Sequence, residues 1–233
     1  ATALAFAAEG AAVAVVDLNQ VGAQAVADEI TAAGGRALAL GVDVSQEQPV
    51  ADAVARVVAE FGGLDVVFNN AGIARRTTAV ETAVEDWDLS FAVNVRSIFL
   101  MCKHAIPHLE AAGGGSIINA GSGWGLKGGG RALPYCASKG AVVNMTRALA
   151  IDHGPANIRV NSVNPGDTDT GMLRSEASQI GWTEAAFLAD AADRPLRRMG
   201  RPAEIAAAVV FLASDDASFV TGSALVVDGG GIA

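Results

Sequence analysis

The sequence has few cysteines, few basic residues and no long hydrophobic run. Two cysteines in 233 residues, Cys102 and Cys136, fit a reducing compartment better than a disulfide-stapled secreted domain, so we expect a cytoplasmic protein. Neither has metal-type partner spacing, and we expect no metal site. The 16 lysines and arginines against 25 aspartates and glutamates give a net charge of −9, opposite to the balance of a nucleic-acid binder. The longest uncharged apolar run, Ile205 to Ala213, is shorter than the roughly 20 residues that span a bilayer, so no membrane span is predicted.

Apolar runs alternate with amphipathic stretches along most of the chain. The runs predict short strands at residues 13–16, 37–42, 64–68, 116–120, 158–163 and 224–227. Helical patterns cover residues 1–9, 21–33, 45–61, 85–109, 135–152 and 202–214, with Ser45 predicted as a helix N-cap. Strands that are apolar throughout and alternate with helices indicate a parallel sheet covered on both faces. We therefore predict an α/β fold, a Rossmann-like doubly wound parallel sheet with helices on both faces, in a single domain over residues 1–233.

The residues that follow the predicted strands are polar or small, and ligands of doubly wound sheets bind at these carboxyl ends. They are Asp17, Asp43, residues 69–72, Ser122 and Pro165–Gly166. An acid in the position of Asp17 hydrogen-bonds the adenosine ribose and repels the 2′-phosphate of NADP, which favours NAD. A solvated turn carboxylate is an equally open interpretation of Asp17 on its position alone.

Tyr135 and Lys139 lie one helical turn apart at the start of a predicted helix, so both project from one face. A lysine ammonium near a phenol favours the phenolate, and we expect Lys139 to lower the pKa of Tyr135 towards the working pH. The same spacing is common on solvated surface helices. Two further residues favour a catalytic interpretation: Ser122 at the end of a strand, and Asn94 inside a predicted helix, where asparagine is unfavourable unless it bonds something specific.

The order and spacing of these motifs resemble the short-chain dehydrogenase/reductase family over essentially the whole chain. The matching segments are Asn69-Asn70-Ala71-Gly72, Asn94 within Phe91–Val95, Ser116–Asn119 leading to Ser122, Tyr135-Cys136-Ala137-Ser138-Lys139, Asn164-Pro165-Gly166 and the tail Thr221–Gly230. The resemblance implies an oxidoreductase that interconverts a secondary alcohol and a ketone by hydride transfer, with NAD preferred over NADP.

The catalytic residues implied by the resemblance are Asn94, Ser122, Tyr135 and Lys139. Tyr135 would exchange a proton with the substrate oxygen, and Ser122 would orient and polarise that oxygen. Lys139 would lower the pKa of Tyr135 and hold the nicotinamide ribose, while Asn94 would anchor a water in a proton relay through Lys139.

The resemblance also implies a set of cofactor contacts. They are Asp17, Leu18, Asp43, Val44, Asn70, Ala71, Gly72, Tyr135, Lys139, Pro165, Gly166, Thr168 and Thr170. Asp17 would select NAD, and Asp43 with Val44 would contact the adenine. The family's first strand and glycine-rich phosphate loop should precede Ala1, so we expect both outside the given chain.

Residues 171–198 occupy the position of the family's mobile substrate lid. The implied substrate contacts are Ser122, Trp124, Tyr135 and Met172. The lid's apolar residues either line a pocket or bury against the core; they are Met172, Leu173, Ile180, Trp182, Phe187 and Leu188. Glycines at 123, 125 and 128–130 predict that the loop after Ser122 can move. The resemblance further implies a homotetramer, with a dimer as the alternative.

Two other functions stay open at this point. An NADPH-dependent 3-oxoacyl thioester reductase is disfavoured by Asp17, because its carboxylate would repel the 2′-phosphate. A non-catalytic dinucleotide-binding protein is disfavoured because such a protein would need none of the four implied catalytic residues.

Overall fold

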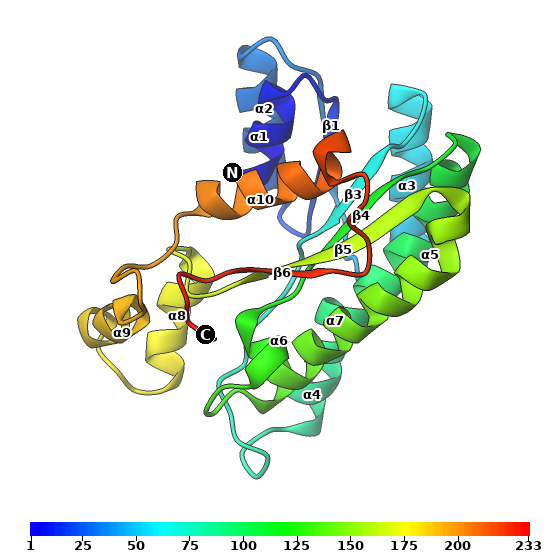
Figure 1. Ribbon diagram of the computed structural model, residues 1–233. Helices are drawn as coiled ribbons and strands as arrows, with labels where there is room; N and C mark the ends of the chain where they lie inside the picture. The colour runs from blue at the N-terminus through cyan, green and yellow to red at the C-terminus, as the bar shows by residue number, and fades with distance from the viewer.

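The computed structural model describes residues 1–233 as a layered α/β fold (Figure 1). The strands are β1 (Val13–Asp17), β2 (Ala37–Gly41), β3 (Val66–Asn69), β4 (Gly115–Ala120), β5 (Ile158–Pro165) and β6 (Ala224–Val227). The α-helices are α1 (Thr2–Ala8), α2 (Gln20–Ala32), α3 (Glu47–Phe61), α4 (Val84–Phe91), α5 (Ser97–Ala111), α6 (Gly123–Lys127), α7 (Leu133–His153), α8 (Gly171–Gln179), α9 (Glu184–Ala192) and α10 (Pro202–Ala213).

All strand pairs are parallel, as predicted, and the strands form two sheets. β1 pairs with β2, and the other four strands follow the order β3-β4-β5-β6. β1 and β3 do not pair with each other. Both line the large cavity described below, so the boundary between the two sheets is part of that cavity.

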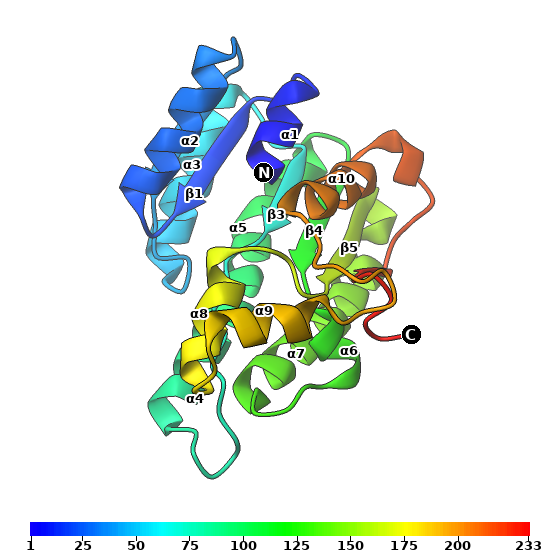
Figure 2. The same ribbon diagram turned by 90° about the vertical axis from the view of Figure 1, so that its left-hand side faces the viewer.

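Helices cover both faces of the sheet (Figures 1 and 2). The helices α1 and α10 pack together on one face, while α5 and α7 cover the other and α3 packs against α5. Successive residues of a strand point to opposite faces, which places Ile117 in the core under α5 and α7 and Ile118 in the core under α10. Both are fully buried, and each such side chain contributes about 1.5–3 kcal/mol of burial free energy.

The helix predicted at residues 85–109 extends over Val84–Ala111 but is not uniform. A π-helical segment, Ala92–Arg96, separates α4 from α5. By length and composition alone this stretch is long and apolar enough to cross a membrane. Its inner side, however, belongs to the core, where Ile98, Cys102 and Leu109 are buried against the sheet. We therefore interpret it as a core helix of the domain.

Two local predictions are wrong. Ser45 does not cap α3, because its hydroxyl donates to Asp43 at 2.7 Å and Gln46 occupies the N-cap position. The glycine-rich stretch after Ser122 contains the short helix α6 rather than only a loop. A Cβ on Gly125 would lie 2.7 Å from the carbonyl of Lys139, so this glycine permits the close packing of α6 on α7.

Candidate active site

One cavity of about 1380 Å³ runs between β1 and β3 along their length. It continues to the carboxyl ends of β4, β5 and β6 and reaches α7 and α8. Twelve of the residues predicted for the site line it: Asp17, Asn70, Gly72, Ser122, Trp124, Tyr135, Lys139, Pro165, Gly166, Thr168, Thr170 and Met172. Residues from widely separated motifs are therefore gathered around one space, as the fold class predicts.

Tyr135 and Lys139 project from the first turns of α7 towards this cavity. The helix begins at Leu133, and Pro134 at its start fixes the backbone angle that a first turn requires. Lys139 is 4% exposed, and its Nζ donates to the carbonyl of Ala120 at 2.6 Å. The same Nζ lies 5.8 Å from the centroid of the Tyr135 ring. Since an ammonium has three donors, Lys139 keeps donors for a ligand.

Burial governs the pKa values of both side chains. Burial raises the pKa of Tyr135 to about 12, and the charge of Glu176 adds to this rise, while the Ser122 hydroxyl opposes it. Burial also lowers the pKa of Lys139 to about 8. Lys139 is not among the influences on the pKa of Tyr135 in the protein by itself, where burial prevails, so the expectation that Lys139 lowers this pKa towards the working pH is not met.

Ser122 is positioned by the end of β4 and the start of α6. It is the N-cap of α6, and its Oγ accepts a hydrogen bond from the Trp124 amide at 3.2 Å. Its own amide donates to the buried Asn164 side chain at 3.2 Å. Because Oγ acts as acceptor in the cap, its hydroxyl proton is free to be donated to an oxygen in the cavity.

Asn94 lies in the π-helical segment and is fully buried behind the cavity. Its Oδ1 accepts from the Ile73 amide at 2.8 Å, and its Nδ2 donates to the Ile73 carbonyl at 3.0 Å and to Ser138 Oγ at 2.9 Å. The specific bonds that the sequence led us to expect are therefore present. They fix the loop after β3 against the start of α7.

Several features of the cavity fit a nicotinamide cofactor. A Cβ on Gly72 would lie 3.3 Å from Asn94 Oδ1 and 3.4 Å from Lys139 Nζ, so only glycine leaves this wall open. At the other end of the cavity, Asp17 closes β1 with an exposed carboxylate. Its Oδ1 accepts only from the Asn19 amide, which leaves Oδ2 for a ribose hydroxyl.

Five predicted site residues do not line the cavity. Asn94 lies behind its wall, Leu18 is 76% exposed beside Asp17, and Val44 and Ala71 lie outside the cavity lining. The carboxylate of Asp43 accepts from the amide and hydroxyl of Ser45, and these bonds lower its pKa. The cofactor contacts of Leu18, Asp43, Val44 and Ala71 stay predictions.

The apolar residues of α8 and α9 divide between the two expected roles. Met172 and Leu173 line the cavity. Phe187, Ile180 and Leu188 instead pack in a small core cluster with Leu173. Trp182 is 49% exposed, so burial in this separate cluster describes Ile180, Phe187 and Leu188, and cavity lining describes Met172 and Leu173.

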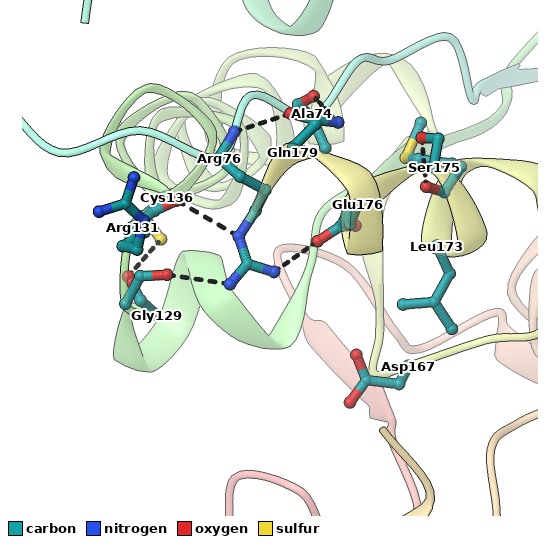
Figure 3. A network of polar contacts seen from close by, with 12 residues as sticks. Ala74, Arg76, Gly129, Arg131, Cys136, Asp167, Leu173, Ser175, Glu176 and Gln179 are labelled. Carbon is teal, nitrogen blue, oxygen red and sulfur yellow. Dashed lines mark hydrogen bonds and ion pairs between the residues drawn. The ribbon is translucent and has the colours of Figure 1, made fainter. Parts of the chain in front are cut away.

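Sequence reasoning missed a group of charged residues in the cavity wall. Glu176 and Asp167 line the cavity, and each is paired with an arginine. Arg76 pairs with Glu176 at 2.8 Å (Figure 3), and Arg194 pairs with Asp167. Arg76 also lies 4.8 Å from the ring centroid of Trp124. The sequence did contain one sign of this charged group, because two consecutive arginines, Arg75 and Arg76, come shortly after the Asn69–Gly72 segment.

Comparisons with known proteins agree with this geometry. Residues 1–231 match the protein family described as Enoyl-(Acyl carrier protein) reductase. The chain is 45% identical over 223 residues to cyclopentanol dehydrogenase of Comamonas testosteroni, covering 95% of this chain and 87% of the relative. It is 39% identical over 228 residues to meso-2,3-butanediol dehydrogenase of Serratia marcescens, covering 98% and 87%.

A solved structure extends the comparison to the fold. The crystal structure of 3-ketoacyl-(acyl-carrier-protein) reductase from Brucella melitensis complexed with NADH aligns with a TM-score of 0.89 and 36% identity. The alignment covers 100% of this chain and 92% of that structure. Sequence motifs, cavity geometry and these likenesses agree, and the chain belongs to the short-chain dehydrogenase/reductase family as an oxidoreductase of alcohol and carbonyl groups.

Proposed function

We propose that this oxidoreductase interconverts an uncharged secondary alcohol and its ketone with NAD as the cofactor. The observation that carries the proposal is the joint position of Ser122, Tyr135 and Lys139 at one end of a cavity whose other end holds the carboxylate of Asp17. The first three residues supply proton transfer and orientation of the substrate oxygen. Asp17 supplies the choice between NAD and NADP.

In the proposed mechanism, the substrate oxygen lies between Tyr135 and Ser122. The Ser122 hydroxyl donates a hydrogen bond to this oxygen and orients it, because its cap role uses only the acceptor side of Oγ. During alcohol oxidation the Tyr135 phenolate takes the hydroxyl proton, and during ketone reduction the Tyr135 phenol returns it. A bound nicotinamide supplies the hydride acceptor or donor.

Lys139 and Asp17 would hold the cofactor at its two ends. The two Lys139 donors not used by Ala120 are free for the nicotinamide ribose. Asp17 Oδ2 accepts from the adenosine ribose hydroxyls. Asn70, Gly72 and Pro165–Gly166 form walls between these points. Asn94 keeps its role as anchor of a relay water as a prediction, beside its bonds to Ile73 and Ser138.

The segment 171–198 would act as the substrate lid. It contains α8 and α9, and Met172 and Glu176 on α8 reach the cavity wall. Relatives named for cyclopentanol and meso-2,3-butanediol support a small secondary alcohol as substrate, while a relative of Sinomonas cyclohexanicum is named for cis-4-hydroxycyclohexanecarboxylate, which carries a charge. The structural neighbour named as a 3-ketoacyl-(acyl-carrier-protein) reductase supports reduction of a 3-oxoacyl thioester as the alternative.

We also infer a cytoplasmic homotetramer. Both cysteines are free, in keeping with a reducing compartment. The helices α4, α5 and α7 would form one interface, and they carry exposed apolar side chains, including Leu89, Phe99 and Ile151. Sedimentation velocity tests this assembly, and a monomer at micromolar concentration would contradict it.

The cofactor proposal is tested by titrating NADH and NADPH separately while nicotinamide fluorescence is recorded. We expect NADH to bind at least about tenfold more tightly, because a carboxylate close to a 2′-phosphate costs more than 1.4 kcal/mol. The variant Asp17→Ser should bring the affinities for NADH and NADPH closer together. Asp28→Ser, which removes an exposed carboxylate of α2, should leave the ratio of these two affinities unchanged. Equal affinity in the wild type contradicts the role of Asp17.

The same protein is then assayed with NAD and cyclopentanol, and with a 3-oxoacyl thioester in the reverse direction. Turnover of cyclopentanol supports the proposed reaction. Turnover of the thioester alone supports the alternative.

A further inference from the structure

Glu176 stands in the cavity wall with one carboxylate oxygen bound and the other free. The residue is 8% exposed, and its Oε2 accepts from Arg76 Nη1 at 2.8 Å. Its Oε1 has no hydrogen-bond partner within the chain. The only fully enclosed side-chain polar atom without a partner in residues 1–233 is His104 Nε2, so Oε1 of Glu176 is open to the cavity that the residue lines.

Arg76 is committed to holding Glu176 in place. Its Nε donates to the Arg131 carbonyl and its Nη2 to the Gly130 carbonyl, both at 3.2 Å, and its guanidinium lies over the Trp124 ring (Figure 3). Each of its three nitrogens uses one N–H in these bonds and its face is stacked on Trp124, so Arg76 is held in one position beside the carboxylate. The guanidinium therefore acts as a support for the carboxylate.

The helix that carries Glu176 is fixed at a second point. Gln179 Oε1 accepts from the Arg76 amide at 3.0 Å, and Gln179 Nε2 donates to the Ala74 carbonyl at 3.4 Å. These two residues lie one turn apart on α8, so the helix is joined to the loop after β3 along one face (Figure 3). Glu176 thus has a defined position relative to the cavity.

Glu176 is also near the proton-transfer residue. Arg76, which holds Glu176, lies 4.8 Å from the ring centroid of Trp124, and Trp124 meets the Tyr135 ring edge-on with 6.3 Å between centroids. The charge of Glu176 also raises the pKa of Tyr135. The other carboxylate of this wall, Asp167, likewise has one free oxygen, because Nε and Nη2 of Arg194 both donate to its Oδ2. Of these two supported acceptors Glu176 is the more enclosed, with a side chain 11% exposed against 20% for Asp167.

We propose that Glu176 is a substrate-specificity residue: its free Oε1 accepts a hydrogen bond from a second hydroxyl of the substrate and makes the enzyme selective for uncharged diols and polyols. The inference rests on the proposed alcohol oxidation and names the substrate class within it. A mono-alcohol leaves this acceptor unpaired in a partly enclosed site, which costs binding free energy. A hydroxy acid brings a second carboxylate next to Glu176 and is repelled.

The test compares three substrates of one ring size: cyclohexanol, vicinal cyclohexanediol and hydroxycyclohexane carboxylate. In the wild type, kcat/KM for the diol should exceed that for cyclohexanol by about tenfold or more, and the carboxylate should be the poorest substrate. In Glu176→Gln, Arg76 retains the amide oxygen because a guanidinium only donates, so an NH₂ group replaces Oε1 at the cavity. The diol should then lose about 10- to 100-fold in kcat/KM, while cyclohexanol changes by less than about threefold.

Glu184→Gln is the matched control. Like Glu176, Glu184 is paired with an arginine, in this case Arg174 of α8. Glu184, however, is exposed and does not line the cavity. This variant should leave all three rates unchanged. NADH affinity and thermal unfolding of each variant show whether the protein remains folded, and the wild-type order of the three substrates tests the inference even if Glu176→Gln does not fold.

The possible results distinguish the proposed reaction from the role assigned to Glu176. No turnover of any of these alcohols by the wild type overturns the proposed reaction, and the assignment of Glu176 with it. Turnover with equal kcat/KM for diol and cyclohexanol, or an equal loss of both in Glu176→Gln, overturns only the assignment of Glu176 and leaves the reaction standing.

Discussion

Two regions of different construction meet at the cavity. The floor comprises Asn94, Ser122, Tyr135 and Lys139, and three of these side chains form hydrogen bonds with the backbone of Ile73, Trp124 and Ala120. The α8–α9 segment, residues 171–192, is held by a small apolar cluster of its own and by ion pairs. Most of these pairs are exposed, as Arg174 with Glu184 illustrates, and only Arg76–Glu176 is nearly buried, with side chains 10% and 11% exposed.

This difference in construction matches two different tasks, proton transfer in the floor and substrate selection in the α8–α9 segment. Buried hydrogen bonds to the backbone hold the side chains of the floor in a single arrangement, and proton transfer requires such fixed positions. Exposed ion pairs contribute about 0–1 kcal/mol each and leave a segment free to open. We therefore expect substitutions in the floor to change turnover, and substitutions in the α8–α9 segment to change stability and substrate choice.

The largest effect is expected from Tyr135→Phe in the floor. Loss of the phenolic oxygen removes the acid and base, and kcat should fall by about 10²- to 10⁴-fold. The ring keeps its edge-on contact with Trp124 at 6.3 Å between centroids, so NADH affinity should not change. Steady-state rates and fluorescence titration measure the two quantities.

The neighbouring Cys136→Ser supplies the control for Tyr135→Phe. Its thiol only contacts the Gly129 carbonyl at 3.8 Å, and we expect near-normal kcat. A Tyr135→Phe variant with more than about a tenth of wild-type kcat would assign the proton transfer to another group.

The floor could be predicted from the sequence because its residues lie in short local motifs. Tyr135 and Lys139 are one turn apart and Ser122 follows a strand, so periodicity and spacing placed them at one edge of the sheet, while their catalytic roles came from the family resemblance. The parallel strands could be predicted for the same reason, and their predicted limits differ from those in the structure by no more than two residues at any end.

The contacts of the α8–α9 segment could not be predicted in this way. Arg76 and Glu176 are 100 residues apart, and nothing in either local sequence specifies the partner. The weak periodicity of residues 171–198 gave no helix limits, although two helices are present. The pKa of Tyr135 was also missed, since burial depends on the whole fold and not on the spacing to Lys139.

The next largest effect is expected on the free energy of unfolding, where Arg76→Met is compared with Arg174→Met. Removing Arg76 leaves the nearly buried Glu176 without its partner and should lower the free energy of unfolding by about 3–5 kcal/mol. Arg174 pairs are 43% exposed or more, and its removal should cost at most about 1 kcal/mol. Urea unfolding followed by circular dichroism measures both.

The pH dependence of Arg76→Met sharpens this comparison. Without Arg76, the folded-state pKa of Glu176 rises further above its unfolded value, so the folded state binds more protons than the unfolded state in that interval. Stability should therefore fall as pH rises, and the deficit should be greater at about pH 8 than at about pH 5. Equal losses of unfolding free energy in Arg76→Met and Arg174→Met would mean that the buried pair contributes no more to stability than the exposed pairs.

A smaller loss is expected from Asn94→Ala. The change leaves the amide and carbonyl of Ile73 without a partner and should destabilise the protein by about 1–3 kcal/mol. Asn119→Ala is the matched control, because Asn119 is equally buried and bonds Asn69 and Thr146 away from the cavity. Both variants should lose stability in urea, but only Asn94→Ala should also lose kcat at a temperature where each is folded.

The last prediction concerns pH and decides between burial and Lys139 as the main influence on the pKa of Tyr135. With the pKa of Tyr135 raised to about 12, little phenolate is present near neutrality, and its fraction grows about tenfold per pH unit. Alcohol oxidation needs the phenolate and should accelerate accordingly between about pH 6 and 8. Ketone reduction needs the phenol, which is already present, so its rate should stay flat.

The oxidation profile should bend near pH 8, where Lys139 loses its proton and its charge no longer favours the phenolate. Lys139→Met should remove this bend and slow oxidation throughout, since no positive charge is left to titrate. Single-turnover measurements keep cofactor release from hiding the proton-transfer step. An oxidation rate that is already flat from about pH 6 would show that Lys139 prevails over burial in the loaded enzyme, and that the spacing of Tyr135 and Lys139 alone predicted the pKa correctly.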